Sequence, residues 1–271
     1  MTPNKTVFIT GSSTGIGRAT AGLFQKNGWQ VAATMRNPEA GGELRALDHV
    51  CVTRLDVTDE ASIHAAVAAA VERFGGVDVL VNNAGYGAYG VLEATSVETM
   101  RQQFETNVIG LLAVTKAIVP GFRKRGSGVV VNVGSIGGRL TLPLSTLYCG
   151  SKFAVEGISE ALTYEMGAIG VRVKLVEPGF IKTNFAQAIK FSNDLSLSEY
   201  QSLADKLWKV AGSLGANGAE PAAVAEVIFA AATDGTDQLR YTAGDDARQS
   251  TAQRAAQDDA TFFKEMRAIW T

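Results

Sequence analysis

The sequence predicts an α/β protein with one domain, in which a doubly wound parallel sheet of about seven strands carries helices on both faces. Two observations predict this fold. Short apolar runs alternate with longer segments of helical periodicity from Lys5 to Asn83, and the first run ends in a glycine-rich turn that opens a helix. Such sheets bind their ligands at the carboxyl ends of the strands. We therefore expect the functional residues to follow the strands directly.

Length and composition agree with this fold and narrow the partners. With 271 residues, of which 46% are hydrophobic, the chain can bury a sizeable core. Its 25 Lys and Arg residues nearly balance 27 Asp and Glu residues, and no run of like charge stands out. This balance argues against a nucleic-acid partner and an anionic membrane surface, and it leaves room for small anionic ligands.

The cysteines and the N-terminus indicate a cytoplasmic protein. Cys51 and Cys149 lie far apart and show no metal-binding spacing, so we expect reduced packing residues and no metal site. The segment from Met1 to Lys5 leads directly into an apolar run without the features of a secretory signal. No apolar run approaches the ~18 residues of a membrane span, so we expect no membrane insertion.

The first strand, Thr6–Thr10, is followed by a glycine turn at residues 11–17 and by a helix over Arg18–Phe24. Glycine lets backbone N–H groups approach a pyrophosphate closely, and the positive end of the helix dipole favours the phosphate charge. Glycine turns between a strand and a helix are common, so the motif alone is weak evidence. Its position after a strand and before a helix makes a dinucleotide site the better interpretation.

The second strand, Gln30–Thr34, decides the cofactor prediction because Met35 and Arg36 follow it. An acidic residue at this position would accept hydrogen bonds from the ribose 2′-hydroxyl of NAD(H), whereas the 2′-phosphate of NADP(H) needs a cation. We therefore expect NADP(H) to be preferred over NAD(H), with Arg36 binding the phosphate through charge-assisted hydrogen bonds. The alternative is that Arg36 is an ordinary solvated loop residue.

The third strand, Val50–Leu55, leads to Asp56 and Val57 at its carboxyl end. The Asp56 carboxylate is placed to accept from an adenine amino group, to cap the following helix, or to do both. That helix is expected over Asp59–Phe74, and a fourth strand follows at Val77–Val81. Every motif up to this point lies at the same rim of the sheet.

Two polar side chains interrupt strongly apolar segments. Asn107 lies in a helix expected from about Gln103 to Arg123, where an amide without partners would cost about 1–3 kcal/mol, so backbone or water must satisfy it. Ser135 ends the most apolar strand, Gly128–Gly134. A serine nucleophile is the rival interpretation of Ser135, and it is disfavoured because neither of the two histidines follows a strand end.

Tyr148 and Lys152 are spaced to meet on one face of a helix that continues to about Gly170. At ~4 Å and an effective dielectric of ~20, a cation attracts a phenolate by about 4 kcal/mol, which corresponds to at most about three pKa units. We therefore expect Lys152 to lower the pKa of Tyr148 toward neutrality, where a general acid or base works. A single Tyr-x-x-x-Lys also occurs by chance on surface helices, so this pair gains weight only from the other motifs.

The C-terminal third supplies a strand at Val171–Val176 and a last strand at Leu239–Ala243. Between them, residues 184–218 show weaker periodicity, and we expect either two amphipathic helices that form a lid over the substrate or a packed surface pair of helices. We place the domain at residues 1–247. The tail, residues 248–271, is expected to be a helical extension that covers the pocket or a subunit contact.

Several motifs occur together in the order and spacing of one known family. They are Thr10-Gly11-x-x-x-Gly15-Ile16-Gly17, Asn82-Asn83-Ala84-Gly85, Asn107, Ser135, Tyr148-x-x-x-Lys152 and Pro178-Gly179. Together they resemble the compact soluble branch of the short-chain dehydrogenase/reductase family, over roughly Lys5 to Thr183 and more loosely to residue 247. The resemblance implies a Rossmann-like fold and an NADP(H)-dependent oxidoreductase that interconverts an alcohol and a carbonyl compound.

The resemblance also implies a role for each matching side chain. Tyr148 exchanges a proton with the substrate oxygen, and Ser135 orients that oxygen. Lys152 contacts the nicotinamide ribose and supports the phenolate, while Asn107 holds a water that joins the lysine to solvent. The expected cofactor-binding residues are Gly11, Ser13, Thr14, Gly15, Ile16, Gly17, Arg36, Asp56, Val57, Asn83, Ala84, Gly85, Tyr148, Lys152, Pro178, Gly179, Ile181 and Thr183.

An apolar pocket is expected for the substrate, a fairly bulky carbonyl or alcohol compound. By resemblance, the long helices near residues 103–123 and 148–170 pair across a two-fold axis, so we expect a homodimer or homotetramer. Burial of these helices against the chain's own C-terminal segment is the alternative. The expected substrate-binding residues are Ser135, Tyr148, Leu142, Phe180 and Phe185.

Two other functions fit parts of this pattern. A regulator that senses NADP without turning anything over would share the fold, but such proteins commonly lack the catalytic tyrosine and lysine, and this chain has both. A sugar-nucleotide epimerase of the extended branch would usually carry a Gly-x-x-Gly-x-x-Gly turn and a larger C-terminal domain, and neither is present. An oxidoreductase is therefore the function that we expect.

Overall fold

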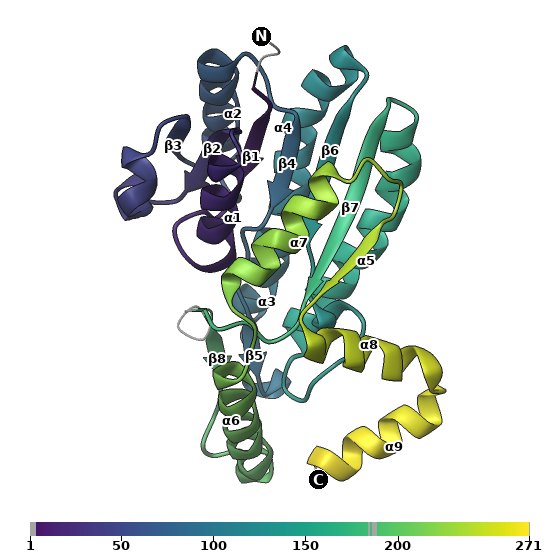
Figure 1. Cartoon of the computed structure of the whole chain (residues 1–271). Helices are drawn as coiled ribbons and strands as arrows, with labels where there is room; N and C mark the ends of the chain where they lie inside the picture. Colours follow the sequence, from purple (N-terminus) through teal and green to yellow (C-terminus); the bar gives the residue numbers. More distant parts are fainter. Residues whose placement is uncertain (1–3, 184, 186–188, 271) are drawn as a thin grey trace.

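A computed structural model describes residues 4–183, 185 and 189–270 of the chain. In this part of the chain, seven strands form one parallel sheet (Figure 1): β1 (Thr6–Ile9), β2 (Gln30–Met35), β3 (Val50–Arg54), β4 (Val79–Asn82), β6 (Gly128–Val133), β7 (Val171–Pro178) and β9 (Arg240–Ala243). Their spatial order is β3-β2-β1-β4-β6-β7-β9. The order reverses between β1 and β4, and a doubly wound sheet opens a crevice for its ligand at such a point.

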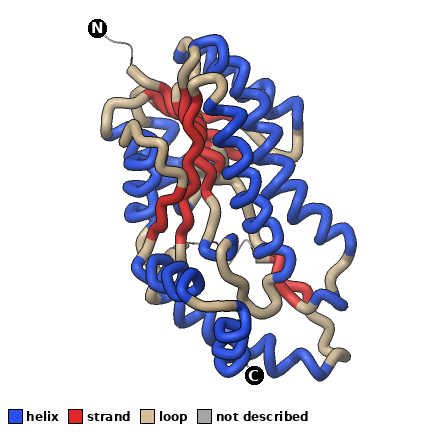
Figure 2. Tube along the Cα trace, turned by 90° about the vertical axis from the view of Figure 1, so that its right-hand side faces the viewer, coloured by secondary structure: helices blue, strands red, loops and turns tan. Residues whose placement is uncertain are grey.

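Helices cover both faces of the sheet. In Figure 2 the strands form a narrow band between these helices. α1 (Gly15–Lys26) and α7 (Pro221–Thr233) pack together on one face. α2 (Glu60–Phe74), α4 (Gly110–Arg125) and α5 (Thr146–Gly167) pack on the other. None of the helices in the described ranges combines the length and the apolar character needed to cross a bilayer.

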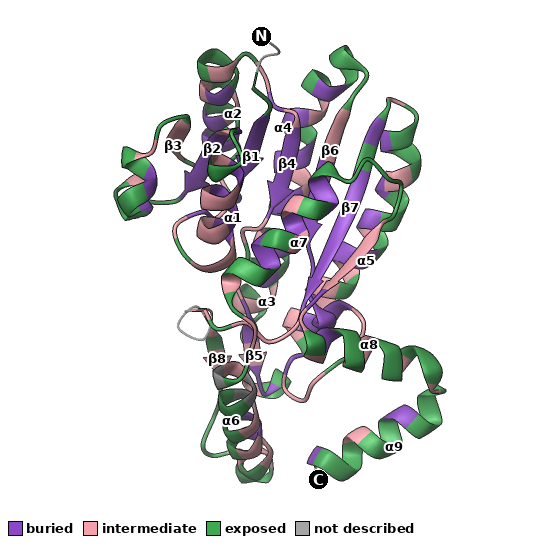
Figure 3. Cartoon of the chain, viewed as in Figure 1, coloured by how far each residue is buried: buried purple, intermediate pink, exposed green. Residues whose placement is uncertain are grey.

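Alternating side chains of the strands build two cores, one on each face. In β1, Val7 and Ile9 belong to the core that includes Phe24 of α1, whereas Phe8 belongs to the core on the opposite face. A strand that is buried on both faces needs apolar residues at both positions of this two-residue period. Figure 3 shows the result, with buried strands and with helices whose outer sides are exposed.

The carboxyl ends of the strands point toward the lower end of the molecule in Figure 1, where several connecting segments gather. α3 (Val97–Phe104) lies there, close to β5 (Ala88–Gly90). β5 pairs in parallel with β8 (Lys190–Ser192), and α6 (Gln201–Ala216) follows β8 in the chain. These elements form the part of the molecule that overhangs the carboxyl rim of the sheet.

The C-terminal tail forms two helices, α8 (Asp245–Ala256) and α9 (Asp259–Trp270). α8 follows β9 directly, so the predicted boundary between residues 247 and 248 falls inside a helix. α9 contacts α6, and its Phe262 and Trp270 are buried. The tail therefore joins the last strand to the overhanging elements.

The predicted fold class is confirmed, and two segments differ from the expectation. In place of one helix over 103–123, the chain forms α3, a π-helical turn at Glu105–Ile109 and α4. In residues 184–218, where we predicted two helices, the described residues form β8, a 3-10 turn at Ser198–Tyr200 and the helix α6; residues 184 and 186–188 lie outside the described residues. β8 is extended because it pairs with β5, and local periodicity contains no sign of such a tertiary contact.

Candidate active site

The glycine turn after β1 forms a cradle at the start of α1. Gly11 and Gly15 have φ values of 71° and 56°, in the left-handed region that favours glycine. A Cβ atom on Gly17 would lie 2.5 Å from the Nδ2 atom of Asn83 and would overlap the carbonyl oxygen of Gly11. The turn therefore presents backbone N–H groups and the positive end of the α1 dipole, a combination that binds phosphate groups.

The remaining predicted residues of the turn differ in how far they are buried. Thr14 is the exposed N-cap residue of α1, Ser13 is half-buried, and Ile16 packs against the core. Thr183, which follows β7, approaches the same turn, because a Cβ on Gly15 would lie 3.3 Å from the Thr183 methyl group. The structure thus brings Thr183 to the cradle, as the prediction of a phosphate contact requires.

Thr10, to which the sequence interpretation gave no role, joins the ends of β1 and β4. Its hydroxyl oxygen accepts from the backbone N–H groups of Asn83 and Ala84, both at 3.0 Å. The Asn83 side-chain amide donates in return to the carbonyl oxygens of Thr10 and Gly11 at 2.9 and 3.1 Å. These bonds hold the segment that ends at Gly85 beside the cradle.

The predicted adenosine end of the site lies at the rim of β2 and β3. Arg36 is exposed directly after β2 and makes no hydrogen bond or ion pair within the described ranges, so its guanidinium is available to an added anion.

Asp56 Oδ1 accepts from the N–H and the hydroxyl of Thr58 at 3.0 and 2.8 Å, while Asp59 caps α2. Asp56 therefore orders its own turn and does not cap the helix. Val57 is buried against the start of α4.

The turn after β7 begins at Pro178 and is held by the C-terminal segment. The N–H of Gly179 donates to the carbonyl of the last residue of β9 at 3.0 Å, and the N–H of Phe180 donates to Asp246 Oδ2 at 2.7 Å. A Cβ on Gly179 would lie 2.5 Å from the Asp246 carboxyl carbon, so a larger residue there would displace the carboxylate that binds the Phe180 N–H. Ile181 forms a parallel bridge with the segment before α7. Sequence reasoning missed Asp246, which is 66 positions from its partner.

Ser135, Tyr148 and Lys152 meet at the carboxyl end of β6. The Ser135 Oγ accepts from a backbone N–H of the 3-10 turn that it begins, at 3.0 Å, and its hydroxyl also hydrogen-bonds the Tyr148 phenol. Lys152, one turn further along α5, donates to the Val133 carbonyl at 3.0 Å. Its Nζ lies 5.9 Å from the centroid of the Tyr148 ring. The structure therefore brings the three predicted reaction residues together.

Burial dominates the electrostatics of this group. It raises the pKa of Tyr148 to about 12, against a smaller lowering by the hydrogen bond with Ser135. Burial also lowers the pKa of Lys152 to about 8. The expected lowering of the Tyr148 pKa by Lys152 is therefore not seen, because loss of water around the phenol outweighs the attraction of an ammonium that is bonded to the Val133 carbonyl. Tyr148 is a protonated phenol at neutral pH.

No histidine approaches Ser135. His49 directly precedes β3, at the end of the sheet opposite to Ser135, and His64 lies on α2 with its Nε2 3.7 Å from Glu60 Oε1. A serine nucleophile therefore lacks a histidine base in this structure.

Asn107 lies in the π-helical turn and is 4% exposed. Its Oδ1 accepts from the N–H of Tyr86 at 3.1 Å, and its Nδ2 donates to the Tyr86 carbonyl at 2.9 Å and to Ser151 Oγ at 3.2 Å. The fully buried Gln103, one turn earlier, donates to the same carbonyl at 3.1 Å and accepts from the N–H of Ala88 at 2.5 Å. The amide of Asn107 is thus satisfied by backbone, as expected. Its role in a water relay stays a prediction.

Aromatic rings cover the Tyr148 side chain. The Tyr89 ring stacks on the Tyr148 ring with centroids 5.2 Å apart, and the Phe185 ring lies 5.9 Å from it. Tyr89 belongs to β5, and Phe191 of its partner strand β8 packs against Trp208 of α6 at 4.9 Å. β5 and β8 therefore place an aromatic layer over the reaction residues.

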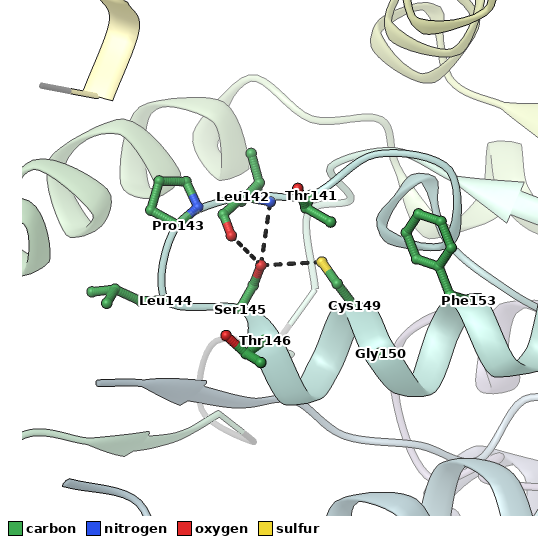
Figure 4. A pocket seen from close by; sticks show the side chains of 9 residues that line it. All are labelled: Thr141, Leu142, Pro143, Leu144, Ser145, Thr146, Cys149, Gly150 and Phe153. Carbon is green, nitrogen blue, oxygen red and sulfur yellow. Dashed lines mark hydrogen bonds between the residues drawn. The ribbon is translucent and has the colours of Figure 1, made fainter. Parts of the chain in front are cut away.

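Leu142 lies in a different place from this layer. It lines a cavity of about 520 Å³ that lies between residues 141–146 and the start of α5 and that extends to Phe153 (Figure 4). Ser135 and Tyr148 are not among the lining residues of this cavity. Of the predicted substrate residues, Leu142 therefore lines this cavity, whereas Phe185 packs against the Tyr148 ring.

The cradle fits a dinucleotide. Glycines leave the backbone N–H groups of the turn uncovered by side chains, α1 begins there, and an exposed arginine follows β2. Within the described ranges, no group of three or more His, Cys, Asp or Glu residues is arranged to hold a metal ion. The arrangement is suited to hold a nucleotide cofactor next to two hydroxyl groups and an ammonium.

Known proteins are similar to this chain in sequence and in fold. The family model described as short chain dehydrogenase matches residues 5–193. An uncharacterized oxidoreductase of Schizosaccharomyces pombe is 46% identical over 229 residues, which cover 84% of this chain and 96% of that protein. The crystal structure of a short-chain dehydrogenase from Streptomyces avermitilis is 34% identical, has a TM-score of 0.85 and covers 98% of this chain and 97% of its own. A structure of ElxO with NADP bound is 28% identical, has a TM-score of 0.72 and covers 88% of this chain and 97% of its own.

Proposed function

The chain belongs to the short-chain dehydrogenase family, and we propose that it is an NADP(H)-dependent oxidoreductase that interconverts an alcohol and a carbonyl compound. The observation that carries this proposal is the convergence of Ser135, Tyr148 and Lys152 at the rim of the sheet that also holds the glycine cradle. When bound, the nicotinamide supplies or accepts the hydride. The residues of the chain contribute binding, orientation and proton transfer.

Tyr148 is the proposed general acid. Its raised pKa, about 12, keeps the phenol protonated at neutral pH, which is the form that donates to a carbonyl oxygen. Ser135 is the second hydroxyl at this point and is proposed to orient the same oxygen. Lys152 is proposed to stabilise the phenolate that remains after proton donation. In the oxidative direction, Tyr148 takes the proton from the alcohol.

The cofactor is proposed to lie across the glycine cradle with its 2′-phosphate at Arg36. A guanidinium binds phosphate oxygens in a fork geometry, and the residue directly after β2 is Arg36 rather than an acidic residue that would accept from a 2′-hydroxyl. Thr183, which lies against the cradle, is proposed to bind a phosphate oxygen, and the turn at Gly179 is proposed to hold the nicotinamide amide. ElxO, a neighbour of the same fold, carries NADP.

The substrate is proposed to be a fairly apolar carbonyl or alcohol compound. The rings of Tyr89 and Phe185 border the Tyr148 phenol, and Phe191 and Trp208 extend the aromatic layer along β8 and α6. A substrate that reaches the phenol must displace or slide along these rings, which favours an apolar body next to the reacting carbonyl.

We propose that two or four copies associate through α4 and α5. Ile109 is 49% exposed on this side of the molecule and lines a groove of about 680 Å³ that runs between the two helices. Exposed apolar side chains around such a groove are typical of subunit contacts. Light scattering should give a dimer or tetramer for the protein and a smaller species for Ile109→Glu. A cytoplasmic location remains our proposal from the sequence.

The enzymatic proposal is tested with purified protein, NADPH and a panel of apolar ketones, aldehydes and quinones, by following the absorbance of NADPH. We expect turnover of at least one carbonyl compound. Tyr148→Phe should reduce kcat by about 10²–10⁴-fold and retain NADPH binding, because it removes the donated proton and little else.

Tyr164→Phe is the matched control, since Tyr164 lies on the same helix and is exposed. It should keep full activity. NADPH binding without turnover of any carbonyl compound would favour a regulator that senses NADP, and an active Tyr148→Phe would remove Tyr148 from its proposed role.

A further inference from the structure

A buried ionic cluster lies one helical turn beyond Lys152. The side chains of Glu156 and Glu177 are 8% and 2% exposed. Arg240 Nε lies 3.0 Å from Glu156 Oε2, and Arg139 Nη1 lies 3.1 Å from Glu177 Oε1. Buried ion pairs cost desolvation energy that their attraction offsets only in good geometry, so such a cluster is weak evidence for stability alone.

The cluster ties together the segments that carry the proposed site. Glu156 is on α5, and Arg139 follows the 3-10 turn that Ser135 begins. Glu177 is the residue before the last in β7, and Arg240 begins β9. Arg240 Nε is also 3.6 Å from Glu177 Oε1, so one guanidinium bridges α5 and β7. The charges of the cluster therefore act at the point where these elements meet.

One oxygen of Glu156 has no donor. Oε2 is bonded to Arg240, whereas Oε1 is buried and has no hydrogen-bond partner in the described part of the chain. Cβ atoms on Gly134 and Gly138 would lie 3.6 and 3.2 Å from Oε1, so this oxygen is packed against backbone. A buried carboxylate oxygen without a donor depends on nearby positive charge. Lys152, four residues earlier on the same helix face, supplies an ammonium.

The charge of Lys152 is linked to that of Glu156. Burial lowers the pKa of Lys152 to about 8, and the negative charge of Glu156 opposes this shift. Burial, and after it the charge of Glu177, raises the pKa of Glu156 to about 7, while Arg240 and Arg139 lower it. Both groups exchange protons near neutral pH, and the charged form of each favours the charged form of the other.

We propose that Glu156 is a positioning residue that keeps the ammonium of Lys152 charged, and that Arg240 holds the Glu156 carboxylate for this purpose. The proposal rests on the proposed function in one respect, which is that Lys152 is treated as a catalytic residue. The charged and titratable groups around Glu156 are Lys152 and Glu160 from α5, Arg139 from the segment after β6, Glu177 from β7 and Arg240 from β9.

The test compares Glu156→Gln with Glu160→Gln. Glu160 is a matched control, because it pairs with Arg240 Nη2 from the same helix but is 56% exposed and lies two turns from Lys152. The first readout needs neither cofactor nor substrate: the protein is acetylated with limiting acetic anhydride between pH 6 and 10, and modification of Lys152 is followed by peptide mass spectrometry, with the other lysines as internal references. The second readout is the pH profile of kcat/KM.

Glu156→Gln should lower the apparent pKa of Lys152 by about one unit, because it removes the neighbouring negative charge. Lys152 should then be acetylated several-fold faster at pH 7, and the alkaline limb of the kcat/KM profile should move to lower pH. Glu160→Gln should leave both readouts unchanged. An apparent Lys152 pKa that is the same in wild type and Glu156→Gln would overturn the proposal, whatever the effect on kcat.

If Glu156→Gln does not fold, Arg240→Gln is measured in its place. Loss of Arg240 raises the pKa of Glu156 and should therefore also lower that of Lys152; an unchanged Lys152 pKa again overturns the proposal. A wild-type protein that turns over no carbonyl compound would end the proposed function, while the acetylation result would still decide the link between Glu156 and Lys152.

Discussion

The two halves of the sheet rim are held by different forces. Around β1 and β4, the cradle is built from backbone and neutral hydrogen bonds, in which the Thr10 hydroxyl and the Asn83 amide join two strand ends. Around β6, β7 and β9, the site is built on buried charge, with Lys152, Glu156 and Glu177 placed in the same region. The structure of the first half therefore depends on steric fit, and that of the second half depends on which of its buried groups are charged.

This difference separates two kinds of substitution. One added methyl group should damage the cradle at any pH, because the fit there is steric. A change of charge without a change of shape should act on the reaction half, and its effect should vary with pH.

Gly17→Ala should have the largest effect among the cradle variants. The added Cβ would overlap the Gly11 carbonyl and press on the Asn83 amide, so the turn must shift. We expect a loss of stability of about 1–3 kcal/mol and an NADPH affinity about 100-fold weaker. Calorimetry and fluorescence titration with NADPH at pH 6 and 8 measure both. An NADPH affinity near that of the wild type, or an affinity loss that depends strongly on pH, would contradict the view that the cradle depends on steric fit.

Arg36→Glu should have a smaller effect, confined to one end of the cofactor. It replaces the exposed guanidinium after β2 with a carboxylate that repels a 2′-phosphate and accepts from a 2′-hydroxyl. We expect NADPH affinity to fall by about tenfold or more and NADH to become the better cofactor. The ratio of kcat/KM for the two cofactors measures the change. A wild-type preference for NADH would contradict the proposed role of Arg36 at the outset.

The pH dependence of stability tests the reaction half. Glu156 has a pKa raised from 4.5 to about 7 in the folded protein, so its contribution to stability is fully present below about 4.5 and is lost as the pH rises through about 7. Glu156→Gln cannot ionise. Its Tm relative to wild type should therefore rise by a few degrees between pH 4.5 and 7. Thermal unfolding at five pH values measures this, with Glu160→Gln as control; a constant difference in Tm would show that Glu156 does not titrate in this range.

Gly22→Ala should have the smallest effect, with the opposite sign to Gly17→Ala. Gly22 lies inside α1, and a Cβ there would meet nothing within 4 Å. Alanine is favoured over glycine in a helix interior by roughly 0.5–1 kcal/mol, so Tm should rise by about 2 °C. NADPH affinity should not change. A loss of affinity would mean that α1 as a whole, rather than the close approach at Gly17, determines the cradle.

Sequence reasoning could predict the fold class and the convergence of Ser135, Tyr148 and Lys152 because the signals are local. Strand runs show a period of two or continuous burial, and a spacing of four residues places two side chains on one helix face. The positions of these residues at strand ends then follow from the parallel sheet, since all carboxyl ends meet at one rim.

The remaining features depend on contacts between distant segments. Glu156 and Arg240 are 84 positions apart and meet only because β9 pairs with β7 next to α5. The direction of the Tyr148 pKa shift depends on burial under a ring from β5, and attraction by Lys152 was the only influence visible in the sequence. Asp246 and the strand β8 were missed for the same reason.

The pairing of β8 with β5 limits how the selectivity of this protein can be redesigned. The two strands match over three residues each, and β5 carries the ring that stacks on Tyr148. A chimera that receives residues 189–218 from a relative would therefore contain the relative's β8 paired with this chain's own β5. Such grafts should keep activity only when the donor segment can restore this three-residue match, so β5 and β8 are best exchanged as one cassette.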